Sequence, residues 1–446
     1  MSVELLWTDK CFLFVLVLSV IILLRAMRKE HIRLSFQQIF KKPLAVSAAI
    51  ILLFFLIIGV LDSIHVKTAT QHEADSLLDR ILAPLSNQLE QTYSAPLALT
   101  LYASETKFVN GKVEQIYPRL NYPPASIKNA DDVKRVVVVN TLIALLVSTG
   151  VLALVWVGIA IIRRVREGVS RVGLNSAALT GCITLLICLT ISLASYWISR
   201  ELHLFGTGKI GQDIFYQTVK SIRTGLVIGI LTTLFMMPLA LLLGIAAGYF
   251  GGFIDDVIQY VYTTLSSIPG VLLITASVLS MQTYIANNPQ KFTTLAQSAD
   301  ARLLALCFIL GVTSWTSLCR LLRAEALKLR EVDFVLAAQA LGSSSFKIIM
   351  KHLLPNVMHI IVITVVLDFS FLVLAEAVLS YVGVGVSPLT ISWGNMINAA
   401  RLELAREPIV WWPMMAAFIF MFVLVLASNL FADAVRDAFD PRQSNG

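Results

Sequence analysis

The feature that most constrains this chain is a series of long apolar stretches. A transmembrane helix needs about 20 consecutive residues that are mostly apolar, and nine segments of the 446-residue sequence reach that length. They span residues 5–24, 43–64, 136–162, 172–198, 219–249, 257–279, 303–322, 357–382 and 409–430. We therefore predict an all-α integral membrane protein with about nine transmembrane helices.

The composition excludes several other classes of protein. Hydrophobic residues make up 57% of the chain and charged residues only 14%, whereas soluble domains have about 45–50% and 25%. A disordered chain and a water-soluble enzyme are both inconsistent with these values. The five cysteines all lie in or beside apolar stretches, where cysteine usually behaves as a small hydrophobe. We therefore expect neither a disulfide framework nor a metal site at Cys11, Cys182, Cys188, Cys307 and Cys319.

The net charge of +7 has a local explanation. Basic residues concentrate in three connections between spans, and cytoplasmic loops carry an excess of Lys and Arg. If nine spans alternate, all three connections fall on one side, which places the N-terminus outside and the C-terminus in the cytoplasm. This distribution explains the charge without a nucleic-acid partner. The residues are Arg25, Arg28, Lys29, Arg33, Lys41 and Lys42, then Arg163, Arg164, Arg166 and Arg171, then Arg320, Arg323, Lys328, Arg330, Lys347 and Lys351.

The only long polar segment, residues 65–134, is predicted to lie outside the membrane. Its first part has apolar residues at helical spacing, which is typical of an amphipathic helix, and Tyr122-Pro123-Pro124 then interrupts regular structure. Two interpretations remain open: a cap packed on the membrane helices, or an element that senses a ligand or docks a partner. The spaced apolar residues are Leu77, Leu78, Ile81, Leu82, Leu85 and Leu89.

No segment carries the residues of a catalytic, cofactor or metal site. The six histidines lack the spacing of metal ligands. The sequence Gly206-Thr207-Gly208-Lys209 resembles the end of a phosphate-binding loop, but such a loop needs a Gly separated from the Gly-Lys pair by four residues, and Ser or Thr after the pair. Those positions are His203 and Ile210. We therefore expect no cofactor and no enzymatic activity in this chain, and any nucleotide site of an energy-driven process would lie on another subunit.

The cytoplasmic segment 320–355 is the most informative part of the sequence. A short helix beginning at Asp333 should stop at Gly342, since glycine is favoured just after a helix end, and Ser343–Ser345 can cap the next helix. That helix is predicted to end before Pro355 and to have one apolar stripe. The segment is either an amphipathic loop on the lipid surface or an element that docks into a groove of a soluble partner. The stripe comprises Phe346, Ile349, Met350, Leu353 and Leu354.

This segment resembles the coupling loop of the permease subunits of ATP-binding-cassette importers. The family pattern is Glu-Ala-Ala, three residues, Gly, nine residues, Ile, one residue and Leu-Pro. Leu336 replaces the family's glutamate, with Glu331 and Asp333 as candidates to take its role, and His352 replaces the isoleucine. The matching residues are Leu336, Ala337, Ala338, Gly342, His352, Leu354 and Pro355. The resemblance implies that residues 331–355 form a coupling helix that docks into an ATPase subunit.

A wider similarity, over residues 203–442, is to the dipeptide and oligopeptide branch of these permeases. It implies a type I permease core at 201–446, with Lys42-Pro43 resembling the start of the family's first span. The remaining parts are then additions: the first of the two N-terminal spans in 1–64, an extracytoplasmic loop or cap at 65–134, and an inserted transmembrane pair at 135–200. The segments that carry the similarity are His203–Thr207, Gly211–Asp213, Ala247–Asp255, Ile268–Gly270, Ser380–Val386, Ser392–Met396 and Asp433–Arg442.

The resemblance also implies partners and a mechanism. Such a permease lies in the bacterial cytoplasmic membrane, in contact with lipid, and works with a second permease subunit, ABC ATPase subunits and an extracytoplasmic substrate-binding protein. It would import peptides or similar small solutes by alternating access. Asp368 and Glu376 lie within the eighth span, where a carboxylate usually faces an interior or a cavity. We expect them to line the pathway; a structural hydrogen bond is the alternative, and Glu376 is close enough to the outer end to reach water.

Two other functions are compatible with a polytopic chain. A membrane sensor using the 65–134 loop would require a cytoplasmic signalling domain, and the inner segments are short. A proton-coupled secondary transporter would use intramembrane ionisable residues but would not need a coupling segment. The 331–355 segment therefore favours the ATP-driven importer.

Overall fold

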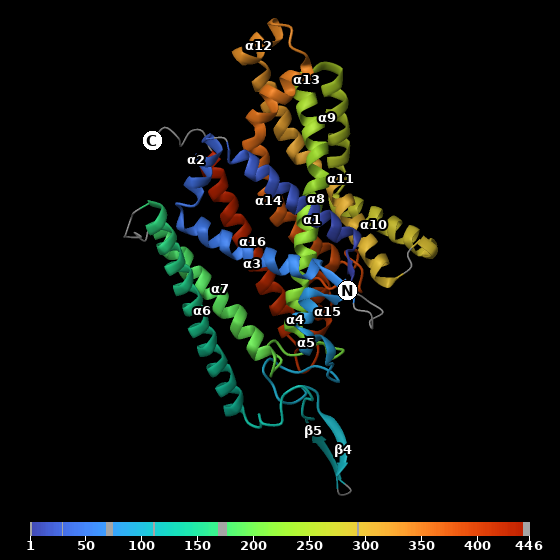
Figure 1. The fold of residues 1–446 in the computed structure, drawn as a ribbon. Coiled ribbons are helices and arrows are strands. Elements are labelled where there is room, and N and C mark those ends of the chain that lie inside the picture. The colour runs from blue at the N-terminus through green and yellow to red at the C-terminus, as the bar shows by residue number, and fades with distance from the viewer. Residues whose placement is uncertain are drawn as a thin grey trace. The chain divides into compact units, whose positions relative to one another are not determined.

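The computed structural model describes residues 2–28, 30–67, 75–109, 112–167, 176–291 and 294–439 (Figure 1). Within these residues, nine helices are long and apolar enough to cross a membrane, which confirms the predicted fold class. They are α1 Trp7–Ala26, α3 Pro43–Ser63, α6 Ala130–Glu167, α7 Ser176–Ser199, α8 Ile214–Phe250, α10 Gly270–Asn287, α11 Leu295–Arg330, α14 Leu354–Tyr381 and α16 Trp412–Phe439. Lys29, Arg171 and the 440–442 part of the C-terminal similarity lie outside the described residues.

Shorter elements connect these helices. Strands β1 Ser2–Glu4, β2 His65–Lys67 and β3 Asp75–Ser76 form a small antiparallel sheet in that order, and β4 Glu105–Val109 pairs with β5 Lys112–Ile116 as a hairpin. The remaining helices are α2 Glu30–Ile39, α4 Leu77–Ile81, α5 Ala83–Asn87, α9 Gly252–Ser267, η1 Pro289–Lys291, α12 Asp333–Ala340, α13 Ser345–Ile348, the π-turn η2 Ile349–Leu353 and α15 Trp393–Glu403.

The prediction of one continuous span over residues 257–279 is wrong. Helix α9 ends at Ser267 and α10 begins at Gly270, with Ile268 and Pro269 between them in extended or turn conformations. A proline lacks the N–H that a continuing helix needs and forces the preceding residue out of the helical region. The apolar sequence is therefore continuous, but the helix is interrupted at Ile268 and Pro269.

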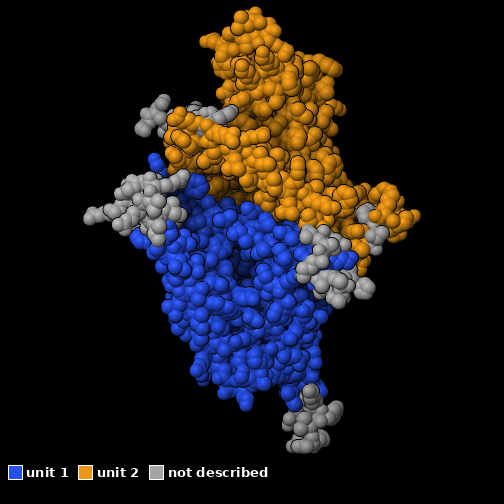
Figure 2. All heavy atoms as spheres, viewed as in Figure 1, with its two compact units in different colours: residues 1–4, 40–223, 391–427 blue, residues 5–39, 224–390, 428–446 orange. Residues whose placement is uncertain are grey.

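The chain divides into two compact units, coloured separately in Figure 2. Unit 1 contains residues 1–4, 40–223 and 391–427, and unit 2 contains residues 5–39, 224–390 and 428–446. Neither unit is continuous in sequence, and α8 and α16 each contribute residues to both.

In unit 1, α7 packs along both α3 and α6. Small residues allow the contact with α3: a Cβ at Gly181 would lie 2.9 Å from the Val46 side chain, and the Thr184 hydroxyl donates a hydrogen bond of 3.0 Å to Ser47 Oγ. Close approach through small and hydroxyl side chains is the usual way in which transmembrane helices associate. Of the predicted inserted pair, α7 therefore packs on α3, and α6 packs on α7.

The polar segment 65–134 forms two short helices where one amphipathic helix was predicted. Pro84 lies in the first turn of α5, and Leu82 separates α5 from α4. Leu82 and Leu85 are buried as expected, with Leu78. Ile81 and Leu89 are exposed: Ile81 is the last residue of α4, and Leu89 lies beyond the end of α5 at Asn87.

The 65–134 segment is held within unit 1 by the loop between α7 and α8. A Cβ at Gly211 would lie 1.7 Å from the carbonyl oxygen of Glu90, so only glycine allows this approach. The Tyr122 ring stacks on the His203 ring at 4.6 Å, and the Tyr122 N–H donates to the Glu90 carboxylate. His203 Nδ1 lies 2.6 Å from Asp213 Oδ2. These contacts favour the interpretation of the segment as a packed cap.

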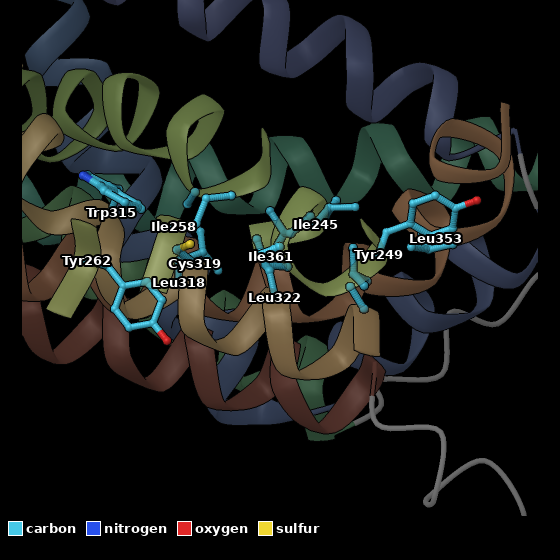
Figure 3. Packing of buried hydrophobic residues seen from close by; sticks show 14 of the residues in the cluster. Ile245, Tyr249, Ile258, Tyr262, Trp315, Leu318, Cys319, Leu322, Leu353 and Ile361 are labelled. Carbon is cyan, nitrogen blue, oxygen red and sulfur yellow. The ribbon is translucent and has the colours of Figure 1, made fainter. Parts of the chain in front are cut away.

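The core of unit 2 gathers α8, α9, α11 and α14 (Figure 3). Within this core, α8 and α11 approach each other closely. A Cβ at Gly244 would lie 2.8 Å from the Cys319 carbonyl oxygen, and one at Gly248 would lie 2.6 Å from both the Ala326 Cβ and the Arg323 carbonyl oxygen. Gly244 and Gly248 therefore bring two backbones together, as small residues four positions apart do in membrane proteins.

Unit 2 also holds the first span, α1. Helix α1 has no side-chain cap of its own, but Asp300 of α11 accepts hydrogen bonds from the backbone N–H and the hydroxyl of Thr8. A carboxylate at this position satisfies a donor that a helix N-terminus leaves unpaired. Asp300 thus links the start of α1 to α11.

Candidate functional site

The coupling segment lies at one end of unit 2, beside the ends of α8 and α9 (Figure 1). Helix α12 follows α11 after two residues. Val335 and Ala338 of α12 and Ile348 and Leu353 of the next helix are buried in the unit 2 core. Their burial fixes α12 and α13 to the spans, so that a force on this segment would be transmitted to α11 and α14.

The opposite side of the segment exposes large apolar residues. Leu341 is 86% exposed and Phe346 is 75% exposed, and Asp333 is also at the surface. Soluble surfaces rarely gather apolar side chains unless a partner or a membrane covers them. The segment therefore offers an apolar contact surface, which we call the coupling surface, made of Phe334, Leu336, Leu341, Phe346 and Met350.

Two assignments in this segment change with the structure. Ala338 is buried in the unit 2 core, so it packs beneath the coupling surface and is not itself available to a partner. Of the predicted apolar stripe, Leu353 is buried whereas Phe346 and Met350 are exposed, and Ile348, outside that stripe, is buried in their place. The π-turn shifts the phase of the helix by a residue, which a regular 3.6-residue pattern does not anticipate. Ala337 and Leu336 are exposed as a docking role requires.

Gly342 ends α12 in a left-handed conformation, with φ of +75°. The Gly342 N–H donates to the Gln339 carbonyl and the Ser343 N–H donates to the Ala338 carbonyl, which is the hydrogen-bond pattern of a Schellman C-cap. A Cβ at Gly342 would meet no atom of the chain within 4 Å. The glycine is therefore required by its backbone conformation, while the space around it is free for a partner.

The end of the motif is a continuous helix, contrary to the expectation that Pro355 ends the element. The π-turn of η2 leads directly into α14, with Pro355 in its first turn, where a missing N–H is tolerated. The Asn356 side-chain amide donates a hydrogen bond of 2.7 Å to the His352 carbonyl. The His352 ring lies 6.0 Å from the Phe334 ring, and so links α12 to the start of α14. Leu354 is half-buried against the core.

An ion pair at the base of the segment was not anticipated. Arg323 of α11 donates from Nε and Nη2 to the two carboxylate oxygens of Asp255 at 2.5 and 2.6 Å, and Gln259 adds a bond of 3.2 Å. These donors hold the pKa of Asp255 below its ordinary value. The pair ties the start of α9 to α11 one turn before α11 leaves the core. The only sequence signal was an acidic residue just after Gly251-Gly252 and an arginine in a basic helix end.

Replacing Asp255 by Asn should lower stability at neutral pH by roughly 1.5–3 kcal/mol, the range for hydrogen bonds to charged groups. A carboxyl whose folded pKa is depressed stabilises the fold above its unfolded pKa, near 3.8, and loses that contribution as pH falls through the lower folded value. Thermal melts of detergent-solubilised protein between pH 3 and 7 measure the effect. The melting temperature of D255N should fall less steeply than that of wild type as the pH is lowered. The exposed neighbour Asp256 provides the control, since D256N should keep the wild-type profile.

The two intramembrane carboxylates of α14 differ in their surroundings. Glu376 is 3% exposed and accepts a hydrogen bond of 2.7 Å from Ser380 Oγ one turn later, so it does not reach the surface of this chain. Asp368 is half-buried, and no donor or cation among the described residues contacts it. A carboxylate without a partner in a span is expected to face a cavity or another molecule. The pathway role thus stays a prediction for both, with Asp368 the more open of the two.

Known proteins are similar to this chain over its second half. Residues 240–445 match the family described as the binding-protein-dependent transport system inner membrane component. The dipeptide transport system permease protein DppC of Lactococcus lactis subsp. cremoris is 34% identical over 245 residues, 55% of this chain and 65% of the relative. The match thus spans just under two thirds of that relative.

Two further relatives give the same picture. The oligopeptide transport system permease protein OppC of Mycobacterium tuberculosis is 31% identical over 239 residues, which are 54% of this chain and 76% of the relative. DppC of Bacillus subtilis is 28% identical over 240 residues, which are 54% of this chain and 69% of the relative. The family match over residues 240–445 includes the coupling segment and the spans on both sides of it.

Proposed function

Since this chain belongs to the family of binding-protein-dependent peptide transport permeases, we propose that it is the membrane-spanning subunit of an ATP-driven importer of peptides or similar small solutes. The observation that carries the proposal is the coupling segment. It keeps the family's spacing, ends α12 with a glycine cap, and exposes apolar side chains above a buried base.

The proposed partners follow from what this chain contains and lacks. A second permease subunit completes the pathway, ABC ATPase subunits bind the coupling surface and hydrolyse ATP, and an extracytoplasmic binding protein delivers the solute. The basic connections support a cytoplasmic C-terminus and an outer N-terminus in the bacterial inner membrane. In this arrangement residues 201–446 form the permease core and the second span of 1–64 corresponds to the family's first span. The first span, the 65–134 loop and the 135–200 pair are then additions.

The mechanism assigned to this chain is mechanical. ATP-driven closure of the ATPase subunits would move α12, and the burial of Val335, Ala338 and Leu353 would pass that motion to α11 and α14. The Asp255–Arg323 pair would carry α9 along with α11. Asp368 lies on α14 within the moving set, where the cationic group of a solute could approach it.

ATP-dependent uptake of labelled peptides into proteoliposomes that contain the whole complex tests this function. The vesicles contain this chain, its second permease and its ATPase subunits, and the binding protein is added outside. We expect accumulation with internal ATP and none when the ATPase subunits carry a substitution that blocks hydrolysis. Accumulation driven by a proton gradient without ATP would instead identify a secondary transporter.

A further inference from the structure

A cavity of about 290 Å³ lies between the end of α10 and the first turns of α11. Its walls include Ile285 and Pro289 from one side and Thr294, Ser298 and Arg302 from the other. In the proposed topology this connection is on the outer side of the membrane, where a solute arrives. The cavity is at the lower end of the roughly 300–1,000 Å³ typical of ligand pockets, which suits one terminal residue of a larger ligand.

The charge of this cavity is unbalanced. Arg302 is half-buried, its Nε is shielded from solvent without a hydrogen-bond acceptor, and no carboxylate among the described residues pairs with it. None of the described residues that line the cavity is acidic. The acidic residue nearest in the helix sequence, Asp300, is engaged by Thr8. Arg302 also borders a narrow crevice that reaches Gly385 after α14.

A half-buried guanidinium without a counterion is unfavourable. Its planar donors match a carboxylate in a two-point hydrogen-bonded geometry. We propose that Arg302 binds the C-terminal carboxylate of a peptide as the peptide enters from the outer side. This assignment rests on the proposed function, and it adds a specificity residue that requires a free carboxylate on the substrate.

Photo-crosslinking of the purified complex in detergent tests the assignment directly. The probes are a tripeptide with a photoreactive last residue, the same peptide as its C-terminal amide, and an isomer with the photoreactive residue first. We expect the free acid to label the 285–302 region, identified by mass spectrometry. We expect the amide, the isomer and the R302Q variant to give labelling at least about tenfold lower there. R302K, which keeps the charge, should retain part of the labelling.

Lys291→Gln is the matched control. Lys291 is a cation at the same end of α10 and α11, but it lies outside this cavity and donates a hydrogen bond to the Tyr284 hydroxyl. It should label as wild type does. Equal labelling of wild type and R302Q would overturn the assignment. Two other results for R302Q would also overturn it if peptide labelling stays unchanged: loss of a bound anionic phospholipid in native mass spectrometry, or dissociation of the second permease.

Uptake in proteoliposomes separates this inference from the proposed function. If wild type imports no peptide, the proposed function fails. If wild type imports the free peptide and R302Q imports it equally well, only the carboxylate assignment fails.

Discussion

Replacing Leu341 and Phe346 together by glutamate is expected to remove the ATPase subunits from the purified complex without reducing the amount of this chain in the membrane. Both side chains are largely exposed in the free chain, so their loss leaves its own core intact. Burial of one such side chain by a partner contributes about 1.5–3 kcal/mol. Since about 1.4 kcal/mol is a tenfold change in affinity, the pair should weaken ATPase binding by roughly 100-fold or more. Co-purification and ATPase titration measure the change.

The matched control is Leu402→Glu, because Leu402 is an equally exposed leucine, 72% accessible, in α15 and far in sequence from the coupling segment. It should leave ATPase binding unchanged. If the double variant keeps wild-type affinity for the ATPase subunits, the coupling surface rests on lipid and does not bind them. Ala338 is a poor site for this test, because a larger side chain there would disturb the core that it faces.

The largest effect on the fold is expected from Gly248→Val. Its Cβ would lie 2.6 Å from the Arg323 carbonyl oxygen and from the Ala326 Cβ, and the carbonyl cannot move without shifting α11. Overpacking of this kind typically destabilises by 1–3 kcal/mol and occasionally by more, so we expect about 3 kcal/mol. If unit 2 unfolds as its own cooperative unit, its melting temperature should fall by roughly 6–12 °C. Thermal unfolding of the purified chain in detergent measures it.

Gly150→Val is the control for that substitution, because Gly150 also lies within a long span but has no atom within 4 Å of the Cβ position. It should melt within about a degree or two of wild type. Adding Ala326→Gly to Gly248→Val should restore part of the loss, since it removes one of the two clashing groups. A wild-type melting temperature for Gly248→Val would show that α8 and α11 are not in close contact.

The coupling segment shows how far sequence reasoning reaches. The spacing from Leu336 to Pro355 predicted a short helix, a glycine stop and a second helix, because those features depend on neighbours along the chain. Which side chains are exposed was harder to predict. Phe346 and Leu353 were placed on one stripe, but the π-turn between them turns Phe346 outward and Leu353 inward.

Long-range polar contacts were beyond the sequence. Asp255 and Arg323 are 68 residues apart, and nothing local marks them as partners. The same is true of Glu90 and Gly211, whose backbones are in contact although the two residues are far apart in the sequence. Such pairs cannot be predicted from a single sequence, because their interaction energy arises only after two elements have packed together.

The sequence by itself determined that the chain is a bundle of about nine membrane helices with a coupling turn. In lipid every backbone polar group must be satisfied within its own segment, so length and apolarity alone specify a spanning helix, and a glycine specifies its cap. The tertiary structure alone decided that the helix over residues 257–279 is interrupted at Pro269, that Ala338 faces inward, and that Glu90 and Tyr122 of the 65–134 segment contact the His203–Asp213 loop. These outcomes depend on side-chain packing and hydrogen bonds between distant segments, which only the folded chain brings within reach.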